Sequence, residues 1–309
     1  MKPMVVILLS DKRSGSTIFE DELCKHPDIN HVVYTPHSYN ETHYWLMAAC
    51  MLGSSRQLFY GHQRYKSYGS NKQARRLLID CICGNVLDFK ILEDDQTLVF
   101  EGWEALCRQF AQPIFFEKSP QHPHHWAALD LMLKWVERTK FNVKFIGLIR
   151  NPMAVMYSAL ELFSTDPFER QFGWAHCYRN ILAMKEMVGK ERFHLVRYED
   201  LIARPKQIFK EIFEFLELDH CDTIGEKVHG QSVSKWLDDQ TFTLQLHESV
   251  VRVAMHFGYT EDDLYNPPKP GLTAKEWIRR QVKGTLKLAK ARLFNRLIKP
   301  FMLSTIRRK

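Results

Sequence analysis

Short apolar runs alternate with longer amphipathic stretches along most of the chain. Residues 4–9 form a continuous apolar run of strand length, and a polar, Gly-containing turn at 10–16 and a helix-like stretch at 17–25 follow it. Similar β-rich runs, separated by helical patterns, recur at 31–34, 114–116, 143–149 and 193–196. Strands that alternate with helices predict an α/β fold, in which helices flank a parallel β-sheet.

Residues 41–110 interrupt this alternation. Their pattern is helical but irregular, and aromatic and basic residues crowd near two glycines, so we expect an insertion or a lid. No Gly/Ser-rich or Pro-rich linker divides the chain before about residue 270. The sequence therefore predicts one domain, 1–272, followed by a C-terminal tail, 273–309.

The composition is that of an ordinary globular protein, with 45% hydrophobic and 26% charged residues in a chain of 309. Seven cysteines are scattered along it, without the repeated CxxC spacing of a zinc or redox site, so we expect reduced and mostly buried thiols. The opening apolar run is far shorter than the roughly 18 residues of a membrane-spanning helix, and it does not resemble a signal peptide. We expect a cytoplasmic protein.

The net charge of +7 is concentrated at the C-terminus. Residues 273–309 contain 12 Lys and Arg and a single acidic residue, Glu276, so the tail carries +11 and the remainder −4. From Ile278 onward, apolar residues recur every three or four positions, which predicts a basic amphipathic helix. This helix either packs on the domain or lies peripherally on an anionic membrane, at its inner surface. Nucleic acid is a less suitable partner, because the body of the chain is acidic.

The first turn has the composition of an anion-binding loop. Backbone N–H groups and the start of the following helix would face the anion, with further donors from Arg13, Ser14, Gly15, Ser16 and Thr17. A Walker A loop has a lysine where Ser16 stands, so ATP γ-phosphate chemistry is poorly supported. Taken alone, the loop is equally consistent with a simple strand-to-helix turn.

A second block lies at the end of the β-rich run at 143–149, where residues 145–149 read Phe-Ile-Gly-Leu-Ile. Arg150 ends this predicted strand, and Ser158 follows eight residues later in a predicted helix. The planar donors of an arginine can bind two phosphate oxygens at once. The alternative is an ordinary surface ion pair.

With these two blocks, the sequence resembles the sulfotransferases that use 3′-phosphoadenosine 5′-phosphosulfate (PAPS). The loop at 13–17 resembles their 5′-phosphosulfate loop, and Arg150-Asn-Pro with Ser158 resembles their 3′-phosphate site. Two further blocks, 197–201 and 232–236, agree in order and spacing, and the resemblance adds to the expected donor site the residues Tyr198, Ser232, Lys235 and Trp236.

The resemblance implies a P-loop-like three-layer sandwich and transfer of a sulfuryl group from PAPS to a hydroxyl or amine, without a metal. One departure stands out, because Asp11 is an unexpected neighbour for a phosphosulfate. We expect its side chain to point away from the donor, paired with Lys12 or capping the helix.

In-line sulfuryl transfer requires cations near the migrating group, and the two candidates are Arg13 and Lys118. The acceptor must also lose a proton to a histidine or carboxylate. The candidate bases, in order of preference, are His37, His122 and Glu41. His122, His124 and His125 also suggest metal ligands, but no matching ligand spacing occurs elsewhere, and we predict no metal.

The leading interpretation is a PAPS-dependent sulfotransferase that acts on a carbohydrate or glycolipid. The Glu-Lys-Ser-Pro block at 117–120 and the aromatic residues of the insertion suit polar acceptors that stack on rings. A P-loop nucleotide kinase is the alternative enzyme. The third alternative is a non-catalytic module that binds membrane or nucleic acid through its basic tail.

Overall fold

The computed structural model describes residues 2–36, 40–59, 67–221, 223–226, 233–271, 273, 275, 282 and 286. Its strands are β1 (Met4–Ser10), β2 (Ile29–Asn30), β3 (Gln57–Phe59), β4 (Ser67–Tyr68), β5 (Ile114–Lys118), β6 (Asn142–Ile149) and β7 (Phe193–Arg197). Its longer helices are α1 (Ser16–Leu23), α2 (Tyr44–Met51), α3 (Asn71–Cys83), α4 (Asp95–Phe110), α5 (Trp126–Val136), α6 (Pro152–Phe163), α7 (Pro167–Val188), α9 (Pro205–Leu216) and α11 (Glu248–Met255). Shorter helical turns are η2 (His122–His124), η3 (Lys190–Arg192), α8 (Tyr198–Ala203), α10 (Lys235–Asp238) and α12 (Glu261–Leu264).

Within the described residues, five strands form one parallel sheet in the order β2-β5-β1-β6-β7. The central strand β1 is buried along its whole length, as a continuous apolar run predicts for a strand covered on both faces. Its alternate residues serve two cores. Val5, Ile7 and Leu9 pack in one core, and Met4, Val6 and Leu8 pack in the other.

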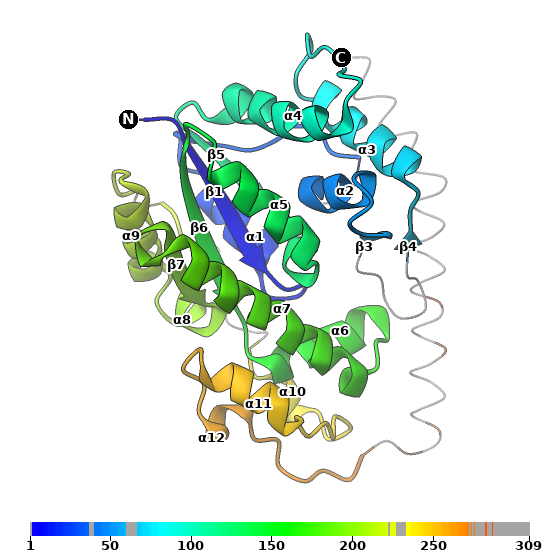
Figure 1. Cartoon of the computed structure of the whole chain (residues 1–309). Helices are drawn as coiled ribbons and strands as arrows, with labels where there is room; N and C mark the ends of the chain where they lie inside the picture. The colour runs from blue at the N-terminus through cyan, green and yellow to red at the C-terminus, as the bar shows by residue number, and fades with distance from the viewer. Residues whose placement is uncertain are drawn as a thin grey trace.

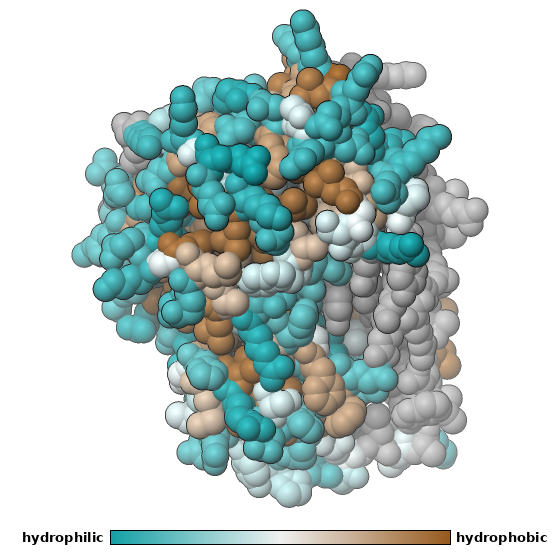
Figure 2. Space-filling view, viewed as in Figure 1, coloured by the Kyte–Doolittle hydropathy of each residue, from teal (hydrophilic) through white to brown (hydrophobic). Residues whose placement is uncertain are grey.

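These two cores make the molecule a three-layer α/β/α sandwich, as predicted. Side chains of α2, α4, α5 and α7 fill the first core, and those of α1, α8 and α9 fill the second. Figure 1 shows α5 and α7 in front of the sheet and α1 behind it. Figure 2 shows that the face in front is mostly hydrophilic, with small apolar patches between polar side chains.

The strands predicted at 4–9, 114–116, 143–149 and 193–196 are confirmed to within two residues at each end. The strand predicted at 31–34 is wrong, because the second strand is the two-residue β2, which ends at Asn30. The backbone N–H groups of Val33 and Tyr34 bond instead to the side chain of Asn85, at 3.0 and 3.1 Å. The amide of Asn85 thus draws these residues away from the sheet edge.

Much of the insertion is part of the packed structure. All eight residues of α2 are buried, and Trp45 packs against Trp103 with ring centroids 5.1 Å apart. Trp103 in turn meets Trp135 of α5 edge-on, at 5.8 Å. Because Trp45 and Trp103 have no exposed surface, they stabilise the core and offer no stacking face to a ligand.

Only four residues of the tail lie within the described part of the chain: Thr273, Lys275, Val282 and Leu286. The last three are helical, and the exposed fractions of Val282 and Leu286 are 54% and 58%. The rest of the predicted amphipathic helix lies outside the described residues. None of the described helices is long and apolar enough to span a membrane.

Candidate functional site

Four segments with polar side chains meet at one edge of the sheet, because the carboxyl ends of parallel strands lie on the same side. Asp11 follows β1, Lys118 ends β5, Arg150 follows β6 and Tyr198 follows β7. The predicted anion-binding segments and the predicted catalytic lysine therefore share one end of the fold, the usual place for a ligand in an open α/β sheet.

The loop between β1 and α1 has a backbone shaped for close approach. Arg13 and Gly15 both adopt left-handed conformations, with φ of 69° and 89°. A Cβ atom on Gly15 would lie 2.2 Å from the Tyr198 ring, so only glycine fits there. Helix α1 then starts at Ser16 without a side-chain cap, which leaves its first N–H groups suited to an anion.

The loop and the predicted 3′-phosphate segment are in direct contact. Arg13 is exposed, and its Nε donates a 3.0 Å hydrogen bond to Ser158 Oγ. Arg150 Nη1 donates a 3.0 Å bond to the Arg13 carbonyl, and the Arg150 guanidinium lies 4.7 Å from the centre of the Tyr198 ring. The structure thus brings together Arg13, Gly15, Arg150, Ser158 and Tyr198, which sequence patterns had predicted separately.

The remaining predicted donor residues lie in varied surroundings. Thr17 is exposed at the first turn of α1 and Ser16 is buried beside it. Ser14 is buried and its Oγ lies 2.8 Å from Tyr178 Oη. The residues of the block at 232–236 differ in exposure. Lys235 is exposed and Trp236 is in the core, whereas Ser232 lies outside the described residues.

Asp11 points away from the anion-binding face of its loop. It is fully buried, and its Oδ1 accepts hydrogen bonds from the Lys12 backbone N–H at 2.7 Å and from His124 Nε2 at 2.8 Å. Its Oδ2 pairs with the guanidinium of Arg170. Burial alone would raise the pKa of Asp11, but the charge of Arg170 and the bond from His124 outweigh it and lower that pKa to about 2.

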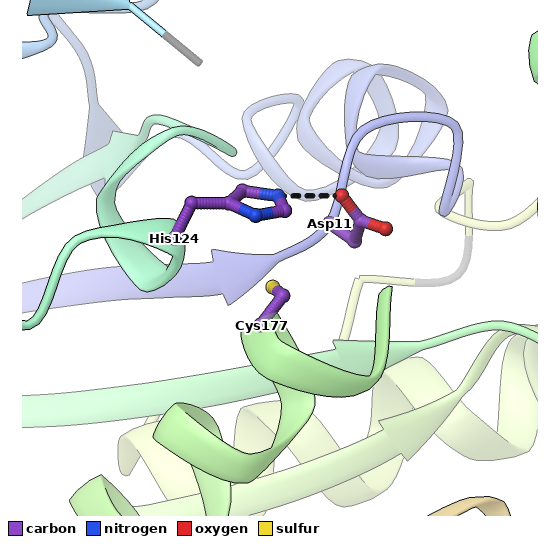
Figure 3. A group of neighbouring side chains, drawn as sticks. All are labelled: Asp11, His124 and Cys177. Carbon is purple, nitrogen blue, oxygen red and sulfur yellow. Dashed lines mark hydrogen bonds and ion pairs between the residues drawn. The ribbon is translucent and has the colours of Figure 1, made fainter. Parts of the chain in front are cut away.

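Asp11, His124 and Cys177 form a buried group whose potential metal-ligand atoms lie within 4.8 Å of one another (Figure 3). Both carboxylate oxygens of Asp11 are already engaged, one of them by the permanent cation of Arg170. Burial also raises the pKa of Cys177 well above its ordinary value, which disfavours the thiolate that binds metals. We therefore interpret this group as an ion-pair centre.

Lys118 lies at the centre of a second cluster and is almost wholly buried. Its Nζ is 3.1 Å from Glu20 Oε2 on α1 and 3.5 Å from Glu41 Oε1 in the segment before α2. Burial raises the pKa of Glu20 to about 7, against the opposing charge of Lys118. The two carboxylates hold the ammonium group at the end of β5, beside β1.

Glu41 is the more exposed carboxylate of this cluster, and its Oε2 lies 3.1 Å from His43 Nε2. Burial would raise the pKa of Glu41, but the hydrogen bond from His43 and the charge of Lys118 lower it instead. Burial lowers the pKa of His43, so its neutral ring donates this bond. At neutral pH, Glu41 is consequently an ionised carboxylate next to Lys118, with the chemistry of a proton acceptor.

The other predicted bases differ in accessibility. His122 has no exposed surface, lies 3.7 Å from Glu117, and has its pKa lowered by burial. Glu117 in turn accepts hydrogen bonds from Thr42 at 2.7 Å and Ser119 at 2.5 Å. His37 lies outside the described residues, so it stays a prediction from the sequence.

Residues 3–222 match the sequence model of the Sulfotransferase family. The chain belongs to the sulfotransferase family. A search of curated protein sequences finds no significant match.

Two solved sulfotransferase domains share the fold of this sulfotransferase. One is from the olefin synthase of Synechococcus PCC 7002, with 24% identity and a TM-score of 0.54 over 83% of this chain and 95% of that chain. The other is from the curacin biosynthetic pathway, with 20% identity and a TM-score of 0.51 over 84% of this chain and 99% of that chain.

Sequence reasoning missed several residues around the sulfotransferase site. Lys12 is half-buried and interacts electrostatically with Glu41, while burial lowers its pKa to about 8. Glu20 and His43 hold Lys118 and Glu41, and Tyr178 reaches Ser14 from a distant helix. The position of a charged Glu20 on the inner face of α1 could have indicated a site residue. A contact between residues 164 positions apart, such as Ser14 and Tyr178, cannot be predicted from a local pattern.

Proposed function

We propose that this sulfotransferase moves the sulfuryl group of PAPS to a hydroxyl or amine of an acceptor. The observation that carries the proposal is the junction of Arg13, Ser158, Arg150 and Tyr198 at the carboxyl edge of the sheet. It joins two segments with anion-binding chemistry, and PAPS has two separate anionic groups, the 5′-phosphosulfate and the 3′-phosphate.

Protein residues of suitable chemistry lie at both ends of the proposed donor site. The 5′-phosphosulfate would be bound by the loop residues 13–17 and the uncapped start of α1. The 3′-phosphate would be bound by Arg150 and Ser158, with Arg13 shared between the two ends. Ser232, Lys235 and Trp236 remain proposed donor residues on sequence grounds.

The proposed reaction is an in-line displacement at sulfur. The acceptor oxygen forms a bond to sulfur while the bond from sulfur to the bridging oxygen breaks, and Lys118 neutralises the charge that develops there. Lys12 and Arg13 supply further positive charge from the loop. Glu41 accepts the proton of the acceptor, because it is the candidate base that lies next to Lys118 within the described residues.

The proposed acceptor class is a carbohydrate or glycolipid. The tyrosines at 60–68 are residue types that suit this class, whereas Glu117, Ser119 and the tryptophans of α2 and α4 are buried and do not contribute. We propose a cytoplasmic enzyme that associates peripherally with an anionic membrane through residues 273–309. The +11 charge of this tail supports that location, together with the exposure of Val282 and Leu286.

The test of the function offers PAPS with labelled sulfur to pools of glycans, glycolipids and small phenols. Transfer of label to an acceptor supports the proposal, and the labelled pool identifies the class. Thermal shifts provide a parallel test: adenosine 3′,5′-bisphosphate should raise the unfolding temperature, and ATP at the same concentration should not. An equal shift with ATP, or the absence of any transfer, would contradict the proposal.

A further inference from the structure

One face of α7 reaches both anion-binding segments. Arg170, Trp174 and Tyr178 are four residues apart, so their side chains project from the same face of the helix. All three are buried, with at most 7% of their surface exposed. Helix α7 lies beside the central strands and runs across the sheet (Figure 1).

The two outer residues of this face hold the loop after β1. Arg170 pairs with Asp11 at the start of the loop, and Tyr178 Oη lies 2.8 Å from Ser14 Oγ in its middle. Tyr178 Oη also donates its single proton to the carbonyl of Leu148, at 2.9 Å. Ser14 therefore acts as the donor in its bond to Tyr178.

The same face also holds the end of β6. Trp174 Nε1 donates a 3.2 Å hydrogen bond to the carbonyl of Arg150, two residues after the Leu148 carbonyl that Tyr178 binds. One rigid helix thus fixes the loop at two points and the Arg150 segment at two points. The relative position of the two segments follows from the spacing of residues along α7.

We infer that Arg170, Trp174 and Tyr178 are positioning residues that set the geometry between the two ends of the donor site. The inference rests on the proposed function, since the donor is PAPS. None of the three side chains is required to touch the donor. Their contribution is to keep the loop and Arg150 at a separation that matches a doubly anionic nucleotide, which reduces the ordering needed on binding.

The sharpest test compares Tyr178→Phe with Tyr44→Phe in the full-length protein. Both tyrosines are wholly buried, and each donates one hydrogen bond to a backbone carbonyl, Tyr178 to Leu148 and Tyr44 to Val99. Both variants should lose thermal stability, and Tyr178→Phe should lose somewhat more, because it also removes the hydrogen bond from Ser14. Only Tyr178→Phe should speed amide hydrogen exchange in residues 12–18 and weaken binding of adenosine 3′,5′-bisphosphate, by about fivefold for the lost bond to the loop residue Ser14.

A second matched pair tests the Arg150 end. Trp174→Phe removes the bond to the Arg150 carbonyl, and Trp135→Phe removes a comparable indole bond to Glu104 away from the site. Only Trp174→Phe should weaken nucleotide binding. The inference is overturned if the two members of each pair behave alike in both exchange and affinity. If the wild-type protein does not bind the nucleotide, the proposed function fails, and the exchange rates of residues 12–18 still decide whether α7 positions the loop.

Discussion

Arg13 Nε donates a hydrogen bond to Ser158 Oγ, across 3.0 Å of space and 145 residues of sequence. The bond makes one arginine common to both anion-binding segments, since Arg150 binds the carbonyl of the same residue. A ligand that engages either segment therefore meets a side chain already oriented by the other. Substitutions in the two segments should consequently interact, as residues of one hydrogen-bond network do.

The first prediction concerns the 3′-phosphate end. Arg150→Ala should weaken binding of adenosine 3′,5′-bisphosphate by about 1.5 to 3 kcal/mol, roughly tenfold to 150-fold, because it removes charge-assisted hydrogen bonds. Ser158→Ala should cost about 1 kcal/mol, and the double variant less than the sum. Isothermal titration measures these affinities, with Arg179→Ala on the exposed side of α7 as the matched control. An unchanged dissociation constant for adenosine 3′,5′-bisphosphate in Arg150→Ala would contradict the assignment of Arg150 to the 3′-phosphate site.

The second prediction concerns Lys118. Lys118→Ala should lower kcat by at least about a hundredfold, the loss seen when one transition-state donor is removed, with a much smaller change in affinity for the desulfated nucleotide. Steady-state kinetics and titration separate the two effects. Lys144→Ala is the matched control, because Lys144 is also a buried lysine that pairs with a glutamate, Glu217, but it lies near the start of β6, at the end of the strand opposite the site. Equal losses in both variants would indicate a purely structural role for Lys118.

The third prediction uses pH to distinguish the candidate bases. The pKa of Glu41 is lowered below its ordinary value of 4.5, so its reactive carboxylate persists as the pH falls from 7 to 5. If Glu41 is the base, any fall of kcat over this range comes from protonation of Glu20, whose pKa is about 7, and should be unchanged in His37→Ala, whereas Glu41→Gln should lose most of the activity. If His37 is the base, kcat should instead fall near pH 6.5, the ordinary histidine value, and His37→Ala should abolish that fall.

The parallel sheet could be predicted because each of its longer strands can be recognised from its own local sequence. The run at 143–149 is apolar except for Lys144, and a strand of this composition can be recognised from its own residues. The two-residue β2 could not be predicted, since its end depends on Asn85, more than 50 residues away, which binds the backbone of Val33. The local sequence around β2 does not reveal such a distant hydrogen-bond partner.

The same distinction applies to the site. Arg150 and Ser158 lie within one strand-to-helix unit, and the pattern of the sequence is enough to select them. The surroundings of Asp11 depend on Arg170 and His124, which come from two separate elements. The sequence marked Asp11 as unusual for an anion-binding loop, but only the fold explains it, because the carboxylate is directed into the protein.

The fourth prediction concerns the tail. Deletion of residues 273–309 should leave turnover of a dissolved acceptor nearly unchanged and should reduce binding to vesicles that contain anionic lipid. Each Lys or Arg near such a surface contributes about 1 kcal/mol, so even partial contact by the +11 segment is measurable by co-sedimentation. Binding of the full-length chain should also weaken at high salt. A truncated protein that unfolds would show instead that the tail packs on the domain.

The fifth prediction concerns the stability that Asp11 provides. Its pKa is about 2 in the folded protein and 3.8 ordinarily, so the folded state binds fewer protons than the unfolded state between these values. The associated stability, ~2 kcal/mol, is fully present above pH 4 and is lost as the pH falls through 2.

Asp11→Asn should lose this part of the acid dependence, so its unfolding free energy should fall less steeply than that of the wild type between pH 4 and pH 2. At pH 7 the same variant should be destabilised by about 3 to 5 kcal/mol, because the cation of Arg170 stays buried without its carboxylate partner. Adding Arg170→Met should recover part of that loss, since the unpaired charge is then gone. Urea unfolding at a series of pH values measures all three proteins. Parallel curves for Asp11→Asn and the wild type below pH 4 would mean that Asp11 does not stabilise the fold through its charge.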